Sequence, residues 1–151
     1  MKSPGRCEVL HRDPTVIIDA AHNPHGAKAL ADTIESEFTF DEVIGVFAAM
    51  ADKDVEGALV ELEKVMDSVI VTKNSSSRSM AVDDLQAIAS KIFGADRVFA
   101  AETLDAAIEK AIKDAVRPLS EDTLGILITG SVVTVGEARA IVRKRFAKDP
   151  A

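Results

Sequence analysis

Residues 19–24, with the sequence D-A-A-H-N-P, place polar side chains directly after the apolar segment 16–18. Asn23 followed by Pro is a favoured helix start, and the free N–H groups there can bind an anion such as phosphate. Asp19 could accept hydrogen bonds from ribose hydroxyls, or it could cap the same helix. His22 could line a site or make a structural hydrogen bond. The spacing therefore predicts a nucleotide site at this turn and leaves both pairs of interpretations open.

Two basic residues follow other strand-like segments. Lys53 could meet a phosphate or carboxylate, or it could be a solvated lysine at a helix start. Arg78, in a serine-rich loop, leaves the same choice between an anion contact and a solvated side chain. Gly125 and Gly130 have P-loop spacing, but Ser-Val follows where Lys-Ser/Thr is needed, and no G-x-G-x-x-G occurs. The chain therefore resembles half of an active site, without a loop that activates phosphate.

Short apolar runs alternate with segments of helical periodicity, and both must position these side chains. The strand-like runs are residues 16–18, 43–48, 69–71, 98–99 and 124–129, with a weaker one at 8–10. Apolar stripes at helical spacing cover 27–34, 55–62, 82–92, 104–112 and 135–142. This alternation predicts a three-layer α/β domain with a mostly parallel sheet of about five or six strands. Residues 124–135 leave open whether the strand continues past Gly130 or turns into a helix at Gly130-Ser131.

The unusual polar residues fall after the predicted strands. Ligands of open α/β sheets bind outside the carboxyl ends of the strands. Asp19 and His22 follow the first parallel strand, Lys53 follows the second, and Ser131 follows the last. We therefore expect one site at this edge of the sheet.

Composition excludes several classes of protein. The chain has 151 residues, 25 acidic against 18 basic, and a formal net charge of −7, so a nucleic-acid partner is not expected. The single cysteine excludes a disulfide within the chain and a Cys-based zinc site. No apolar run approaches the roughly 18 residues that span a membrane, so no membrane partner is expected. The N-terminus lacks the apolar core of a signal peptide, and a cytoplasmic location is expected.

Motifs in order along the chain resemble a known family. Residues 19–24 are similar to the D-G-A-H-N-P motif of folylpolyglutamate synthases and dihydrofolate synthases, members of the Mur ligase superfamily. Residues 4–6, Pro-Gly-Arg, resemble the entry into that family's C-terminal domain. Residues 50–54 are similar to its D-K-D segment, and Arg78 stands where the family carries an Arg before a helix. Residues 130–137 resemble its closing G-S-x-x-x-x-G-E pattern, although Val-Val-Thr follows the G-S here.

The resemblance implies a Rossmann-like domain from an ATP-dependent ligase. That enzyme activates a pteroate or folate carboxyl with ATP to give an acyl phosphate, which the amine of L-glutamate attacks to form an amide. Magnesium neutralises charge on the transferring phosphoryl group. The family's P-loop and metal ligands lie in a larger N-terminal domain, so no metal ligand is expected in this chain. Residues 1–151 then form one C-terminal domain, with 1–3 as an artificial start and 148–151 as a tail.

The resemblance also assigns site residues. Arg6 and Asp19 match the ATP-contacting Arg and Asp, and Asn23 belongs to the same cofactor-binding motif. His22 matches the histidine that lines the cleft and counts as both a cofactor-binding and a catalytic residue. Lys53 and Ser131 are expected as further catalytic residues, near the glutamate or closing the cleft.

The expected partners are ATP, L-glutamate, folate or dihydropteroate, and a missing N-terminal domain of the same chain. Alone, this domain is expected to be inactive, because nothing in it can cradle the β- and γ-phosphates. Two alternatives stay open. One is the C-terminal domain of a peptidoglycan-type Mur ligase, and the other is a free-standing nucleotide-binding module without catalysis.

Overall fold

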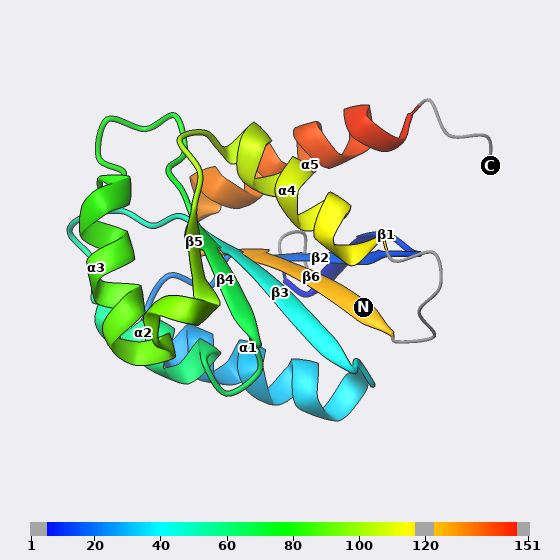
Figure 1. Cartoon of the computed structure of the whole chain (residues 1–151), viewed down its shortest axis with the longest axis horizontal. Helices are drawn as coiled ribbons and strands as arrows, with labels where there is room; N and C mark the ends of the chain where they lie inside the picture. The colour runs from blue at the N-terminus through cyan, green and yellow to red at the C-terminus, as the bar shows by residue number, and fades with distance from the viewer. Residues whose placement is uncertain (1–5, 117–122, 148–151) are drawn as a thin grey trace.

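A computed structural model describes residues 6–116 and 123–147, and the strands in these residues form one sheet of the predicted α/β type (Figure 1). The strand order is β1-β2-β6-β3-β4-β5, with β1 antiparallel to β2 and all other neighbours parallel. The strands are β1 (Glu8–His11), β2 (Thr15–Asp19), β3 (Glu42–Phe47), β4 (Ser68–Val71), β5 (Val98–Ala100) and β6 (Leu124–Thr129). The expected artificial start (1–3) and tail (148–151) lie outside the described residues.

Helices cover both faces of this sheet. They are α1 (Pro24–Glu37), α2 (Val55–Leu62), α3 (Val82–Phe93), α4 (Leu104–Ala115) and α5 (Val132–Phe146), with a short 3-10 helix at Ala95–Arg97. α1, α2 and α3 pack on one face, and α4 and α5 pack on the other (Figure 1). Among the described residues, no helix has the length and apolar content needed to cross a membrane.

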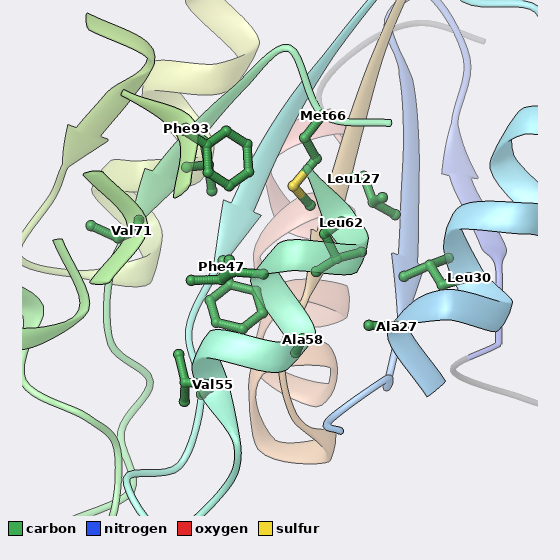
Figure 2. Packing of buried hydrophobic residues seen from close by; sticks show 14 of the residues in the cluster. Ala27, Leu30, Phe47, Val55, Ala58, Leu62, Met66, Val71, Phe93 and Leu127 are labelled. Carbon is green, nitrogen blue, oxygen red and sulfur yellow. The ribbon is translucent and has the colours of Figure 1, made fainter. Parts of the chain in front are cut away.

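Alternate residues of the central strands feed two separate cores, which explains why these strands lack polar alternation. In β2, Ile17 packs toward α1 and α2, whereas Val16 and Ile18 pack toward α4 and α5. Figure 2 shows the first core, where Phe47 lies beside helix α2 and Met66 lies over the sheet. A Cβ on Gly45 would lie 2.3 Å from the sulfur of Met66, so glycine in β3 makes room for this side chain.

The predicted helical stripes are buried except at two positions, Ile92 in α3 and Ile141 in α5, which are only half-buried. In α3 the last buried residue is Phe93, and the expected Ile92 is only half-buried. The physical reason is the end of the helix at Gly94 (φ 91°), where the chain turns away and Phe93 packs into the core in place of Ile92.

The turn after β6 resolves the boundary that the sequence left open. Gly130 has φ 127°, and a Cβ there would lie 2.1 Å from the carbonyl oxygen of Ala48. Only glycine fits this left-handed conformation and this close approach. The strand therefore ends at Thr129, and Ser131 is the N-cap of α5.

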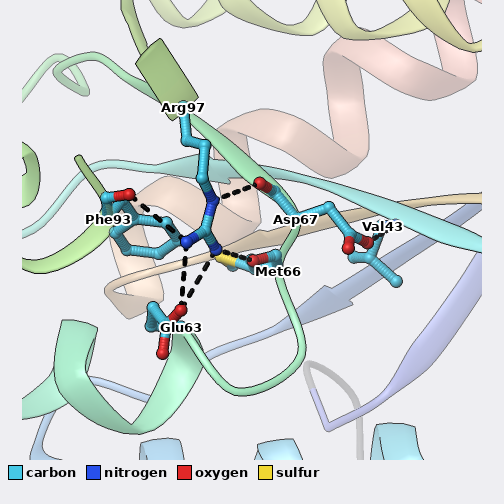
Figure 3. A network of polar contacts seen from close by, with 6 residues as sticks. All are labelled: Val43, Glu63, Met66, Asp67, Phe93 and Arg97. Carbon is cyan, nitrogen blue, oxygen red and sulfur yellow. Dashed lines mark hydrogen bonds and ion pairs between the residues drawn. The ribbon is translucent and has the colours of Figure 1, made fainter. Parts of the chain in front are cut away.

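Arg97 ties together the loops at the amino end of the sheet, on the side opposite to the predicted site (Figure 3). Its guanidinium donates to Glu63 Oε2 at 3.1 and 3.2 Å, and to the carbonyl oxygens of Met66, Asp67 and Phe93 at 2.8–3.2 Å. These contacts join the end of α2, the start of β4 and the end of α3. Arg97 is therefore a structural residue.

Candidate nucleotide-binding site

A cleft of about 740 Å³ lies at the carboxyl end of β2, between the segment that precedes β1, helix α1 and the start of α5. Its lining includes Arg6, Asp19, His22, His25 and Val132. Arg6 and both histidines are exposed, and Val132 is 69% exposed although apolar. The cleft therefore combines a cation, a carboxylate, two imidazoles and an open apolar side chain.

Asp19 holds two chain segments together at this cleft. One carboxylate oxygen accepts from the backbone N–H of Cys7, and the other accepts from the N–H of Ala21, both at 2.9 Å. The first bond fixes the segment that carries Arg6, and the second fixes the turn that carries His22. The helix-cap interpretation of Asp19 is wrong, because Asn23 caps α1. Each carboxylate oxygen has acceptor capacity left for a ligand hydroxyl.

Asn23 and Pro24 start α1 as the sequence predicts. The Asn23 side chain accepts from the N–H of Gly26 at 2.7 Å, and Pro24 is the first helical residue. His22 directly precedes this cap, and its Nδ1 lies 3.2 Å from the carbonyl oxygen of Ala20. This contact orients an exposed imidazole at the mouth of the cleft, so the structural hydrogen bond and the site position occur together.

Ser131 is placed differently from the catalytic role expected of it. It is 3% exposed, and its Oγ accepts from the N–H of Thr134 at 3.0 Å as the cap of α5. Asn74 Nδ2 donates to Ser131 Oγ at 3.2 Å and to Thr134 Oγ1 at 2.9 Å. Thr134 Oγ1 donates in turn to the carbonyl oxygen of Ala48 at 2.7 Å. The hydroxyl of Ser131 thus belongs to a buried polar network and does not line the cleft.

Sequence reasoning missed Asn74 and Thr134, which complete this network. The signal for Thr134 is its spacing of three residues from Ser131, where a capped helix brings its first-turn hydroxyl back to the cap. Asn74 gives no such signal, because its partners lie 57 and 60 residues away in the sequence. Only the neighbouring positions of β3, β4 and β6 bring these groups together.

Lys53 lies outside the cleft, on the loop after β3. It is exposed, and the same loop is held by Arg78, which donates to Asp52 at 2.7 Å. The backbone N–H of Ala51 also donates to the carbonyl oxygen of Arg78 at 2.8 Å. The hydrogen bond from Arg78 lowers the pKa of Asp52 below its ordinary value. Arg78 thus pairs with a carboxylate of its own chain. The sequence alone leaves the choice between a contact with a bound anion and a solvated side chain.

The structure brings Arg6, Asp19 and His22 together at one cleft. Asn23 caps α1 beside it without lining it, and Lys53 and Ser131 also lie outside the lining. Pro4 and Gly5, which precede Arg6 in the motif, lie outside the described residues. The cleft is open on the side of Val132, where an exposed apolar side chain faces solvent.

Comparisons with known proteins identify the family of this chain. A family model described as "Mur ligase, glutamate ligase domain" matches residues 5–132. The dihydrofolate synthase/folylpolyglutamate synthase of Mycobacterium tuberculosis is 48% identical over 156 residues, covering 98% of this chain and 31% of that protein. The protein of the same name from Escherichia coli is 30% identical over 142 residues, covering 94% of this chain and 31% of that protein.

A solved structure shares the fold over the whole chain. Folylpolyglutamate synthase of M. tuberculosis, complexed with ADP and AMPPCP, matches with a TM-score of 0.86 and 46% identity. The match covers 100% of this chain and 34% of that one. The chain thus spans about a third of the length of the two curated relatives named above.

Proposed function

Since the chain belongs to the family of Mur ligase glutamate ligase domains, we propose that it is the C-terminal, nucleotide-binding part of an ATP-dependent ligase. The proposed reaction joins L-glutamate to folate or dihydropteroate through an acyl phosphate. The observation that carries the proposal is the cleft where Arg6, Asp19 and His22 meet. The identity to dihydrofolate synthase/folylpolyglutamate synthases, over nearly the whole chain, favours this substrate class over the UDP-linked substrates of peptidoglycan-type enzymes.

Each cleft residue has a proposed role that fits its chemistry. Arg6 offers a planar, permanently charged guanidinium for a phosphate or for stacking on a base. Asp19 accepts a ribose hydroxyl with the lone pairs that its two backbone contacts leave free. His22 reaches the same space from the turn before α1. Asn23 supports the site indirectly, because its amide oxygen is engaged as the helix cap.

Lys53 and Ser131 take different proposed roles. Lys53 is exposed on a loop at the same edge of the sheet, where it can close over an anionic substrate. Ser131 is buried and bonded on several sides, so we assign it to positioning the start of α5.

Magnesium belongs to the same proposal, where it would neutralise charge on the transferring phosphoryl group. Residues 6–116 and 123–147 contain no group of three or more His, Cys, Asp or Glu side chains that could hold a metal ion. In this proposal its ligands come mainly from the part of the relatives that this chain does not span.

The test uses the full-length protein that contains this chain, with ADP release measured in the presence of magnesium, L-glutamate and dihydropteroate. Arg6→Ala is expected to raise the KM for ATP by about 10- to 100-fold, because one charge-assisted contact is worth roughly 1.5–3 kcal/mol. The matched control is Arg12→Ala, an exposed arginine in the turn between β1 and β2. Equal KM values for the two variants would contradict the proposed role of Arg6. Turnover only with a UDP-linked muramoyl substrate would reassign the ligase.

A further inference from the structure

The loop after β4, residues 72–80, is held on one side by helix α5. Its buried Asn74 donates to Ser131 and Thr134, as described above. The next residue, Ser75, donates its backbone N–H to Glu137 Oε1 at 3.0 Å and also donates its hydroxyl to Glu137 Oε2. Residues 131, 134 and 137 are spaced three apart, which places them along one side of a helix. α5 and its cap therefore hold this loop with three polar side chains that are spaced three residues apart.

The same loop is joined on its other side to the loop after β3, residues 48–54. Arg78 forms an ion pair with Asp52 at 2.7 Å, and its carbonyl oxygen accepts from the N–H of Ala51 at 2.8 Å. The N–H of Met80 donates to the carbonyl oxygen of Ala49 at 2.8 Å. Lys53 lies within this second loop. The position of Lys53 thus depends on a chain of contacts that begins on α5.

In this series of contacts from α5 to Lys53, Glu137 is the residue that holds the exposed part of the loop after β4. Ser75 and Arg78 are exposed, so their backbone could adopt other conformations without loss of buried area. Ordering one residue costs about 1–2 kcal/mol of conformational entropy, and a carboxylate that accepts from both the N–H and the hydroxyl of Ser75 opposes that cost. Asn74 is also bonded to Ser76 and Ser79 within the loop, but Glu137 is the contact from α5 that holds the exposed Ser75.

We propose that Glu137 is a positioning residue of the ligase. By holding Ser75 it fixes the loop after β4, and through the Arg78–Asp52 pair it fixes the loop that carries Lys53 at the edge of the site. This inference rests on the proposed function for its effect on catalysis. The hold on the loop itself is independent of that function.

The experiment compares Glu137→Ala and Glu137→Gln with the matched control Glu109→Ala in the full-length protein. Glu109, on α4, also contacts a single side chain, Arg145, at 2.9 Å, and the substitution removes the same charge. Glu137→Ala is expected to lower kcat by about tenfold, as small misplacements of an aligned group do. The KM for ATP is expected to stay at the wild-type value, because Arg6, before β1, and Asp19, at the end of β2, are not held by the loops after β3 and β4. Glu137→Gln is expected to recover most of the activity, since its amide oxygen can still accept from Ser75.

Amide hydrogen exchange gives a second readout on the same proteins. Faster exchange at residues 75–79 and 50–54 is expected in Glu137→Ala but not in Glu109→Ala. The proposal is overturned by wild-type kcat in Glu137→Ala, by an equal loss in the control, or by unchanged exchange in both loops. If the wild-type protein shows no ligase turnover, the proposed function fails, and the exchange comparison alone decides whether Glu137 holds the loops.

Discussion

Asp19 shows how a residue chosen for its chemistry can also carry structure. Its two oxygens hold the backbone at Cys7 and at Ala21, so the carboxylate shapes the cleft that it lines. A ligand role and a structural role are therefore not alternatives at this position. Substitution removes both together, and stability must be measured beside nucleotide use.

Asp19→Ala is expected to destabilise the chain by about 1–3 kcal/mol, because two partly buried N–H groups lose their acceptor. Urea denaturation of the chain and the variant measures this difference. Asp32→Ala serves as the control, since its ion pair with Lys28 is exposed on α1 and should contribute less than about 1 kcal/mol. Equal midpoints for the two variants would show that the Asp19 contacts add no stability.

The carboxyl group of Asp52 gives a prediction in pH. Its pKa is lowered chiefly by the hydrogen bond from Arg78, so Arg78→Ala should raise the pKa of Asp52 toward its ordinary value. A depressed carboxyl pKa favours the folded state above the unfolded pKa, and this contribution is lost as the pH falls through the folded pKa. The pair is therefore complete at neutral pH. Carboxyl carbon NMR titration measures the shift, and an unchanged Asp52 pKa in the variant would exclude the pair in solution.

Residue-level prediction succeeded where the partners are close in sequence. Asn23 and Pro24 start α1 as predicted, because the cap bonds a residue only three positions away. The backbone partners of Asp19 include Cys7, 12 residues earlier, which no local pattern indicates. Ser131 likewise accepts a hydrogen bond from Asn74, which lies 57 residues earlier in the loop after β4.

Among the elements, the two ends of the sheet differ in the groups that they carry. The carboxyl end holds the cleft and the polar loops, whereas the amino end is closed by Arg97 and the carbonyl groups around it (Figure 3). The catalytic proposals therefore concern the carboxyl end, whereas the contacts of Arg97 at the amino end are structural.

Arg97→Lys is expected to lower stability by about 1–3 kcal/mol, since an ammonium group cannot satisfy the same fork of acceptors. The carbonyl oxygens of Met66, Asp67 and Phe93 would each lose the hydrogen bond that the guanidinium donates. Thermal unfolding measures the change, with Arg145→Lys as the control because Arg145 pairs with Glu109 on the surface. If both variants unfold at the same temperature, the Arg97 contacts add no more stability than the surface pair of Arg145.

For the whole molecule, the cleft is open and lacks a P-loop. The 151-residue chain is therefore expected to show no turnover of ATP with magnesium, L-glutamate and dihydropteroate, because nothing in the described residues encloses the β- and γ-phosphates. A coupled assay for ADP measures this directly, with the full-length protein as the positive control. Robust turnover by the chain alone would contradict the proposal that this chain supplies only one part of the active site.

The sequence by itself determined the kinds of elements and their approximate limits. Apolar runs and helical stripes predicted the strands and helices, because burial on a sheet face or a helix side leaves a period in the local sequence. It also identified the turn that lines the cleft, since Asp19, His22 and Asn23 are adjacent.

The strand order, in which β6 lies between β2 and β3, follows from the folded domain and from no local pattern. That order brings Asn74 to Ser131 and Glu137 to Ser75 across 57 and 62 residues. It also leaves Lys53 outside the cleft that Arg6 and Asp19 share. The physical reason is that such contacts arise from the pairing of whole strands, whose partners are selected by packing over the entire domain and leave no local period to detect.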